Sequence, residues 1–241
     1  MKHRLFGAAL FASLAVTTTL APISGSEALG QTKAAKTGTG TAATQTIEAP
    51  NGAVVVGSPT AKHTLVEYIS YTCGHCADFA AESETPIKSY VASKKVKVEY
   101  RSLLRDPFDF AAALLAHCGT PQQFAGNHAL LLKNQKSWID KARAATDAQK
   151  ANWSTGDDYG VRLTHIAADT GMIALMGQRG FTTAQAQTCL ADANKQEQLL
   201  TMTEDAAAKG VEGTPTFFLD DRMLSSHNWT SVKTDLDAAV K

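Results

Sequence analysis

The chain lacks an excess of charge of either sign. Its 241 residues include 23 Lys and Arg and 23 Asp and Glu, which gives a formal net charge of +0 at pH 7. Proteins that bind nucleic acid or an anionic membrane surface normally present a basic excess. The balance of charges therefore gives no electrostatic support to nucleic acid or a membrane surface as a partner.

A hydrophobic run long enough to span a bilayer is also missing. The most apolar stretch, residues 5–20, is short and rich in Thr, whereas a transmembrane helix needs about 20 apolar residues. It follows a basic start and precedes small residues, which predicts a secretory signal peptide within residues 1–30, cleaved after Ala21 or after Gly30. An uncleaved N-terminal anchor is the alternative. No cysteine lies in this region, which argues against a lipid-anchored lipoprotein.

Large apolar side chains are nearly absent from residues 31–50, which are mostly Thr, Ala, Gly, Lys and Gln. Such a segment cannot bury enough surface to offset the entropy lost on ordering. We therefore expect a flexible leader here. A helical oligomerisation stalk is the alternative, but Gly38, Gly40 and the many threonines disfavour a helix.

Cysteine is scarce, and the four that exist all follow the leader: Cys73, Cys76, Cys118 and Cys189. Behind a signal peptide, an even number of cysteines predicts disulfides. The short spacing of Cys73 and Cys76 selects one pair and leaves Cys118–Cys189 as the other. We expect this second pair to be a structural staple, because neither cysteine has a CxxC neighbour or a helix-start glycine. A second redox pair is the alternative.

The stretch 64–79 joins an apolar run of strand length to residues that suit a helix, and Cys73-Gly74-His75-Cys76 lies at the junction. This order places Cys73 at the helix N-terminus, where unpaired N–H groups and the helix dipole stabilise a thiolate. Cys73 is the predicted nucleophile and Cys76, about one turn inside, the resolving cysteine. His75 offers a cation or N–H donor to the Cys73 thiolate, which would make the disulfide a stronger oxidant.

Other roles for a CxxC pair find little support. A metal site needs two more ligands nearby; no second CxxC exists and His75 is too close to share. Haem attachment needs His after the second cysteine, where this chain has Ala77. A static disulfide would close too small a ring to stabilise much. The sequence thus predicts thiol–disulfide exchange with no metal or other cofactor. Three further histidines lack matching acidic partners and are expected to be ordinary surface or core residues: His117, His128 and His165.

The periodicity of the remaining chain changes from strand to helix and back. Strands are expected at 53–56 (an edge), 65–71 (central) and 94–104 (one wet edge or face), with a helix from Gly74 to about Val91 that is kinked or divided at Pro86. Helices are expected at 108–118, 121–134, 142–151, 162–176 and 183–209, the last capped around Thr182. A strand at 216–219, a short strand at 223–224 and a helix at 227–241 follow. The order resembles a thioredoxin fold, an α/β architecture, at 51–107 and 210–241, with an all-helical insertion at 108–209.

Three features together give the chain a family resemblance: the stretch from Glu67 to Cys76, the long helical insertion, and the stretch from Gly210 to Phe217. With them, essentially everything after residue 50 resembles the DsbA-like branch of the thioredoxin superfamily, the thiol–disulfide oxidoreductases of the bacterial periplasm. The resemblance implies a periplasmic or secreted enzyme that introduces disulfides into reduced, secreted polypeptides. A quinone-linked, DsbB-like membrane partner would reoxidise it. The Gly-His dipeptide resembles that of protein disulfide isomerase, whereas DsbA has Pro-His.

The same resemblance gives roles to three residues outside the CxxC motif. Thr214-Pro215 matches the cis-proline loop that faces the redox pair, and the backbone of Thr214 would pair with an extended substrate; an ordinary trans proline is the alternative. Glu67 matches an acid that is buried beneath the active site and moves protons to the resolving cysteine. Burial would raise its pKa. Lys95 or Lys97 is its candidate basic companion, and a solvent-facing strand residue is the alternative for Glu67.

Two other functions stay open at this point. The first is a disulfide isomerase or reductase kept reduced by a DsbD-like membrane thiol donor. Thr214 and the Gly-His dipeptide favour it, whereas the lack of an evident dimerisation domain argues against it. The second is a chaperone-like binder of unfolded chains, in which the cysteines are incidental.

Overall fold

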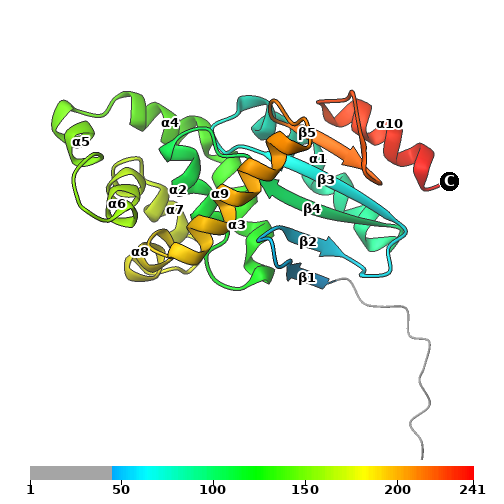
Figure 1. Cartoon of the computed structure of the whole chain (residues 1–241), viewed down its shortest axis with the longest axis horizontal. Coiled ribbons are helices and arrows are strands. Elements are labelled where there is room, and N and C mark those ends of the chain that lie inside the picture. Colours follow the sequence, from blue (N-terminus) through cyan, green and yellow to red (C-terminus); the bar gives the residue numbers. More distant parts are fainter. Residues whose placement is uncertain (1–44) are drawn as a thin grey trace, which may run out of the picture. The chain divides into compact units, whose positions relative to one another are not determined.

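A six-stranded mixed sheet forms the centre of the protein (Figure 1). The computed structural model describes residues 45–241, so the predicted signal peptide at 1–30 and residues 31–44 of the predicted leader lie outside the described part. The strand order is β1-β2-β4-β3-β5-β6. The strands are β1 Gln45–Glu48, β2 Val54–Gly57, β3 His63–Ile69, β4 Val96–Ser102, β5 Thr216–Leu219 and β6 Arg222–Met223.

The central position predicted for the second strand is confirmed. β3 pairs in parallel with β4 and antiparallel with β5, and nearly all of its residues are buried. Alternate side chains of a strand face opposite sides of the sheet. Leu65 packs in one cluster with α1 (Gly74–Ala92) and α10 (Trp229–Ala239), whereas Val66 and Tyr68 pack against Ala206 of α9 (Ala193–Ala208). Figure 1 shows α9 crossing the face of the sheet that is turned toward the viewer.

The N-terminal edge of the sheet differs from two predictions, an edge strand at 53–56 and a flexible leader that extends to residue 50. β2 is not an edge strand, because it pairs with β1 on one side and β4 on the other. Residues 45–48, expected to belong to the flexible leader, form that outer strand β1. Glu48 in β1 forms an ion pair with Lys195 of α9 and lies 3.9 Å from His117, which therefore has an acidic neighbour after all. Backbone pairing and these polar contacts order a segment whose own side chains bury little.

Helix α1 runs without division from Gly74 to Ala92 and contains Pro86. Proline removes one helical N–H donor, but the helix is anchored on both sides of Pro86. Phe79 before it and Ile87 and Val91 after it are buried in the same cluster as Trp229, Val232 and Leu236 of α10. Packing therefore keeps one helix where the sequence left open two abutting ones.

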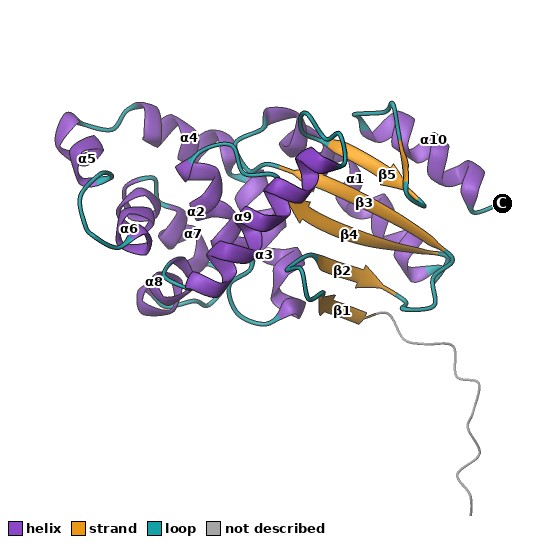
Figure 2. Cartoon of the chain, in the orientation of Figure 1, coloured by secondary structure: helices purple, strands orange, loops and turns teal. Residues whose placement is uncertain are grey.

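Helices fill the chain between β4 and β5, as the periodicity predicts (Figure 2). Two predicted helices are each divided in the structure, 162–176 at Gly171, which has a left-handed φ of 82°, and 183–209 at Asp192, whose side chain caps the following helix. The predicted helix at 142–151 is replaced by the end of α4 (Gln135–Arg143) and by α5 (Asp147–Asn152), which begins just after the capping residue Thr146. The helices are α2 Pro107–Ala116, α3 Pro121–Lys133, α4 Gln135–Arg143, α5 Asp147–Asn152, α6 Tyr159–Asp169, α7 Met172–Gly177, α8 Thr183–Leu190 and α9.

The helical part is closed by a disulfide and by a core shared with the sheet. Cys118, just after α2, is bonded to Cys189 in α8, at a sequence separation of 71. The same hydrophobic cluster contains Val54 of β2, Ile69 of β3 and helical residues such as Leu131 and Leu163. The insertion therefore packs directly on the end of the sheet where the redox pair lies. No helix among residues 45–241 is long and apolar enough to cross a membrane.

Candidate active site

The two CxxC cysteines lie at the start of α1, directly after the central strand. Cys73 is the N-cap residue and has extended backbone angles, and its carbonyl oxygen accepts hydrogen bonds from the N–H groups of Cys76 and Ala77. Both thiols are free, so the structure holds the dithiol form. Cys73 is 5% exposed and Cys76 is fully buried. A thiol that approaches from solvent can therefore reach the sulfur of Cys73 and not that of Cys76.

The surroundings of the two sulfurs push their acidities apart. The hydrogen bond from the Cys76 thiol is the main cause that lowers the pKa of Cys73 to about 5, with help from Thr214 and the backbone N–H groups of Cys76 and His75. The same interaction, together with burial, raises the pKa of Cys76 far above its ordinary value. At neutral pH the pair thus holds one proton, on Cys76, and Cys73 is a thiolate.

His75 does not act on Cys73 through its imidazole in this structure. Its side chain is 86% exposed, and Nδ1 lies 4.0 Å from a carboxylate oxygen of Asp78. His75 instead contributes its backbone N–H, which adds to the stabilisation of the Cys73 thiolate by the Cys76 thiol. The position of residue 75 in the first turn of α1 explains this, because the N–H groups there have no partner within the helix.

The loop before β5 completes the site from the other side. The Thr214–Pro215 peptide bond is cis. The thiol of Cys73 donates a hydrogen bond to the carbonyl oxygen of Thr214, at 3.1 Å. The hydroxyl oxygen of Thr214 is buried and has no partner, so it is free to turn toward the sulfur once Cys73 has lost its proton. A small pocket of about 280 Å³ lies beside this loop, between Pro215, Met223 and His227.

Glu67 is buried within β3, on the same face as Leu65 and therefore on the side of α1. It is 2% exposed, and burial raises its pKa to about 8. One of its carboxyl oxygens has no hydrogen-bond partner. The carboxyl group is close enough to Cys76 for its charge to raise the pKa of that thiol. A carboxyl group that holds a proton at neutral pH is therefore available beside the resolving cysteine.

Neither lysine proposed as a companion contacts Glu67. The parallel register places Lys97 beside Thr64, and Lys95 precedes β4 and bonds the carbonyl oxygen of Val240 with its Nζ atom. The neighbours of Glu67 across the ladders are Tyr100 and Phe217. Both lysines therefore lie nearer the opposite end of the strand.

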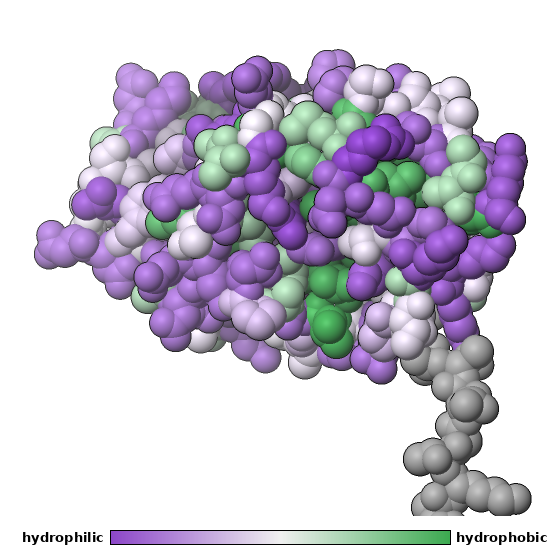
Figure 3. Space-filling view, turned by 45° about the vertical axis from the view of Figure 1, so that its right-hand side comes forward, coloured by the Kyte–Doolittle hydropathy of each residue, from purple (hydrophilic) through white to green (hydrophobic). Residues whose placement is uncertain are grey.

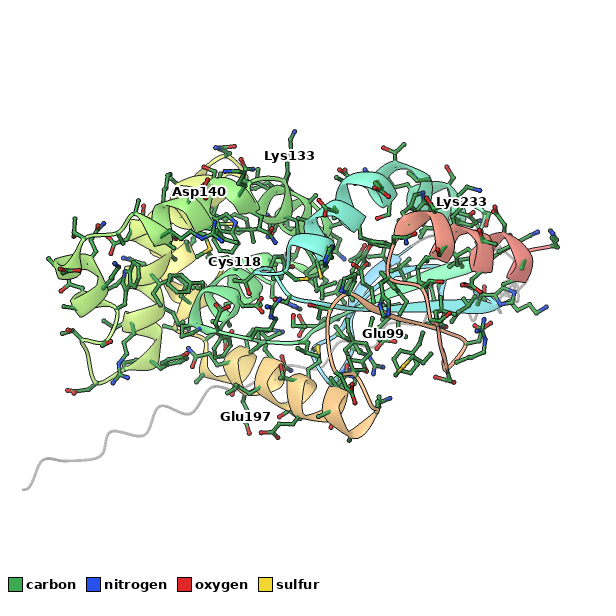
Figure 4. All side chains as sticks on the ribbon, turned by 90° about the horizontal axis from the view of Figure 1, so that it is seen from above. Glu99, Cys118, Lys133, Asp140, Glu197 and Lys233 are labelled. Atoms are coloured by element: carbon green, nitrogen blue, oxygen red, sulfur yellow. A yellow bond between two sulfur atoms is a disulfide. The ribbon has the colours of Figure 1, made fainter. Side chains whose placement is uncertain are left out.

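Glu67 also lines a cavity of about 880 Å³ between α1 and α3. The polar side chains Tyr100 and His128 line the same cavity, and the rest of its lining is largely small or apolar, including Ala77, Ala81, Ala129 and Leu132. Lys133, which also lines it, extends outward from α3 in Figure 4. The outer surface is mainly hydrophilic in the view of Figure 3, with separate apolar patches.

Known proteins share this fold. The sequence model of the thioredoxin family matches residues 49–238. The chain belongs to the thioredoxin family. A crystal structure of protein-disulfide isomerase from Novosphingobium aromaticivorans is 33% identical, covers 79% of this chain and 98% of that one, and has a TM-score of 0.73. Wolbachia pipientis alpha-DsbA1, at 22% identity, has the same fold, with a TM-score of 0.57 over 80% of this chain and 92% of that one.

The curated relatives carry a consistent description. A putative protein-disulfide oxidoreductase of Rickettsia bellii is 28% identical over 192 residues, and one of Rickettsia felis is 24% identical over 199 residues. The matches cover 78% and 81% of this chain. The chain spans 64% and 63% of the length of these relatives, so they are longer proteins. The predicted α/β fold, a thioredoxin fold with a helical insertion, is confirmed by the family match and by the solved structures.

The structure brings Cys73, Cys76, Thr214, Pro215 and Glu67 to one end of this thioredoxin fold, and it joins Cys118 to Cys189 within the helical part. The sequence did not indicate the polar residues, in and just before the insertion, that hold the segment before Cys73. These are Asp106, Asp109, His128 and Gln135. Asp106 had one usable signal, because it directly precedes Pro107 as a helix N-cap does; the others depend on tertiary contacts.

Proposed function

We propose that this protein is a thiol:disulfide oxidoreductase that introduces disulfides into reduced, secreted polypeptides through Cys73 and Cys76. The observation that carries the proposal is the pairing of an acidic thiol at a helix N-terminus with a shielded thiol behind it. A thiol of low pKa is present as the nucleophilic thiolate at neutral pH, and it is also a good leaving group. The names of the relatives support the same reaction class.

The proposed reaction begins from the Cys73–Cys76 disulfide. A substrate thiolate attacks the sulfur of Cys73, forming a mixed disulfide, and breaks the bond to Cys76, whose sulfur leaves and takes up a proton. A second substrate thiolate then attacks the substrate sulfur of the mixed disulfide and releases Cys73 as a thiolate. The substrate has lost two electrons to form its disulfide, and the protein has gained them. Glu67 is the proposed proton donor to Cys76, since its carboxyl group lies near that thiol and holds a proton at neutral pH.

The direction of transfer depends on the stability of the Cys73 thiolate. A stabilised thiolate favours the dithiol form, which makes the disulfide an oxidant. We therefore favour the oxidase, located in the periplasm and reoxidised by a DsbB-like membrane partner. One observation favours the second candidate, an isomerase or reductase supplied by a DsbD-like donor: the solved relative at 33% identity is described as a protein-disulfide isomerase.

The redox equilibrium with glutathione, measured with Cys118–Cys189 intact, tests the proposal. A potential of about −120 to −150 mV supports the oxidase, and a value of about −200 mV or below supports the isomerase or reductase. In a companion assay, a reduced and unfolded polypeptide with two cysteines should be oxidised by the wild type and not by Cys73→Ser. Cys76→Ser should instead trap the mixed disulfide. Full oxidation by Cys73→Ser would contradict exchange through Cys73, and a Cys73→Ala/Cys76→Ala variant that still binds unfolded chains would point to the chaperone-like binder.

A further inference from the structure

A buried glutamine of the helical insertion contacts the residue that carries the candidate nucleophile. Gln135 is the first residue of α4 and is 7% exposed. Its side-chain Nε2 donates to the carbonyl oxygen of Tyr71 at 2.8 Å and to that of Cys73 at 2.7 Å. An amide NH₂ group has two hydrogens, so these two bonds use its full donor capacity on one loop.

The carbonyl of Cys73 belongs to the first peptide of the redox helix. It also accepts the N–H groups of Cys76 and Ala77, at 3.2 and 3.3 Å, which close the first turn of α1. Gln135 makes the shortest of the three contacts. Holding this carbonyl fixes the peptide plane that enters the helix, and with it the N–H groups of the first turn that stabilise the Cys73 thiolate.

The same loop is held by three other side chains, which lie in the insertion or just before it. Asp109 accepts hydrogen bonds from the hydroxyl of Ser70 and the N–H of Tyr71, and Asp106 accepts one from the hydroxyl of Thr72. His128 shares a hydrogen bond with the hydroxyl of Tyr71. These three hold the segment before Cys73. Among these four side chains, only Gln135 reaches Cys73 itself.

We propose that Gln135 is a positioning residue that sets the reactivity of Cys73, so that the helical insertion tunes the redox equilibrium of the Cys73–Cys76 pair. This inference rests on the proposed function and deepens it. The positive end of the amide dipole faces the backbone of Cys73, so it favours a negative charge on the nearby sulfur. Loss of the amide destabilises the thiolate, raises the pKa of Cys73 and shifts the redox equilibrium toward the disulfide.

The surroundings of Gln135 allow its replacement by Met without collapse of the core. Gln135 lines the cavity between α1 and α3, so water from that cavity can bond the two carbonyls that lose their donor. Gln135→Met keeps the length and burial of the side chain and removes only the amide. Gln196 offers a matched control, because its Nε2 donates to the carbonyl oxygen of Leu190 at 2.8 Å, in a part of the fold that does not touch the loop of Cys73.

The test compares wild type, Gln135→Met and Gln196→Met in the full chain. Two quantities are measured, the equilibrium constant with glutathione and the pH midpoint of Cys73 alkylation. We expect Gln135→Met to shift the equilibrium about three- to tenfold toward the disulfide, where tenfold corresponds to about 30 mV, and to raise the alkylation midpoint. Gln196→Met should lower stability without changing either. Gln135→Glu, which adds a carboxylate at the same place, should shift both at least as far.

A Gln135→Met protein with wild-type equilibrium and midpoint, and with a loss of stability like that of Gln196→Met, would reduce Gln135 to a purely structural residue and overturn the inference. The result is separable from the proposed function. If the wild type fails to exchange with glutathione, the proposed function is wrong. The alkylation midpoint, which requires no exchange, still decides the role of Gln135.

Discussion

The thiol of Cys73 and the carbonyl oxygen of Thr214 are joined by a hydrogen bond of 3.1 Å. The two residues reach this contact from neighbouring strands, since β3 runs into Cys73 and β5 begins just after Thr214. The bond exists only while Cys73 carries its proton. When the proton leaves, the carbonyl of Thr214 loses this donor, so ionisation of the thiol and the hydrogen-bonding state of the loop change together.

The acidity of Cys73 can be measured directly. In the reduced protein, the rate of Cys73 alkylation should be half-maximal near pH 5, because the Cys76 thiol and the first-turn N–H groups stabilise the thiolate. Cys76 should remain unmodified, since it is fully buried and its pKa is raised. In Cys76→Ala the midpoint should rise, because the strongest donor is gone. A wild-type midpoint near the ordinary thiol value of about 8.5 would contradict the arrangement of the site.

Glu67 should make the protein less stable as the pH rises. Its pKa is about 8 in the folded chain against 4.5 for an ordinary glutamate, so the folded state binds a proton that the unfolded state releases. The free energy of unfolding should fall between about pH 4.5 and 8, by at most roughly 1.4 kcal/mol per pH unit from this group. Below pH 4.5 both states are protonated and the contribution is complete.

Urea unfolding of Glu67→Gln at several pH values checks this expectation. The variant should lose the part of the decline that comes from Glu67, keep the part from Asp109, whose pKa burial raises to about 7, and be more stable than the wild type near pH 8. Glu197 lies on the exposed side of α9 (Figure 4) and supplies the control Glu197→Gln, which should keep the wild-type decline. An identical pH dependence in Glu67→Gln and the wild type would mean that Glu67 is ionised in the folded protein.

The second disulfide should stabilise the fold without setting the redox chemistry. Cys118 and Cys189 close a loop with a sequence separation of 71, for which the chain-entropy model gives about 4 kcal/mol. Cys118→Ala/Cys189→Ala should lower the free energy of unfolding by an amount of that order and leave the glutathione equilibrium of Cys73–Cys76 unchanged. A shifted equilibrium at unchanged stability would favour the second redox pair instead.

Two glycines should respond in opposite ways to alanine. A Cβ atom on Gly74 would meet no atom within 4 Å, so Gly74→Ala should stabilise the chain by about 0.5–1 kcal/mol through the unfolded state. Gly57 has a φ of 142°, and its Cβ would lie 2.8 Å from the Cα of Lys97, so Gly57→Ala should destabilise by more than about 1 kcal/mol. Thermal unfolding of both variants checks the pair, and a stabilised Gly57→Ala would show that β2 and β4 can separate there.

The CxxC pair and the central strand could be predicted because each is indicated by neighbouring residues in the sequence. An apolar run before CxxC needs no tertiary information, and Thr182 with Gln185 shows a capping box in the sequence that the structure confirms. The failures share a physical cause. β1 is ordered by pairing with β2, and the place of Lys97 follows from its register against Thr64. Gln135 meets Cys73 only after the insertion has folded back on the sheet. Such contacts leave no periodic trace in the chain.

The strand topology also orders events during synthesis. β3 lies between β4, its near neighbour in the chain, and β5, whose register partners are about 150 residues further on. Synthesis therefore reaches Cys73 and Cys76 long before Thr214 and β5 are made. Until Thr214 and β5 have been made, Cys73 lacks its hydrogen bond to the carbonyl oxygen of Thr214. Pairing of β5 with β3 is thus what brings the Thr214–Pro215 loop to two cysteines whose own interaction and first-turn N–H groups are local to the CxxC motif.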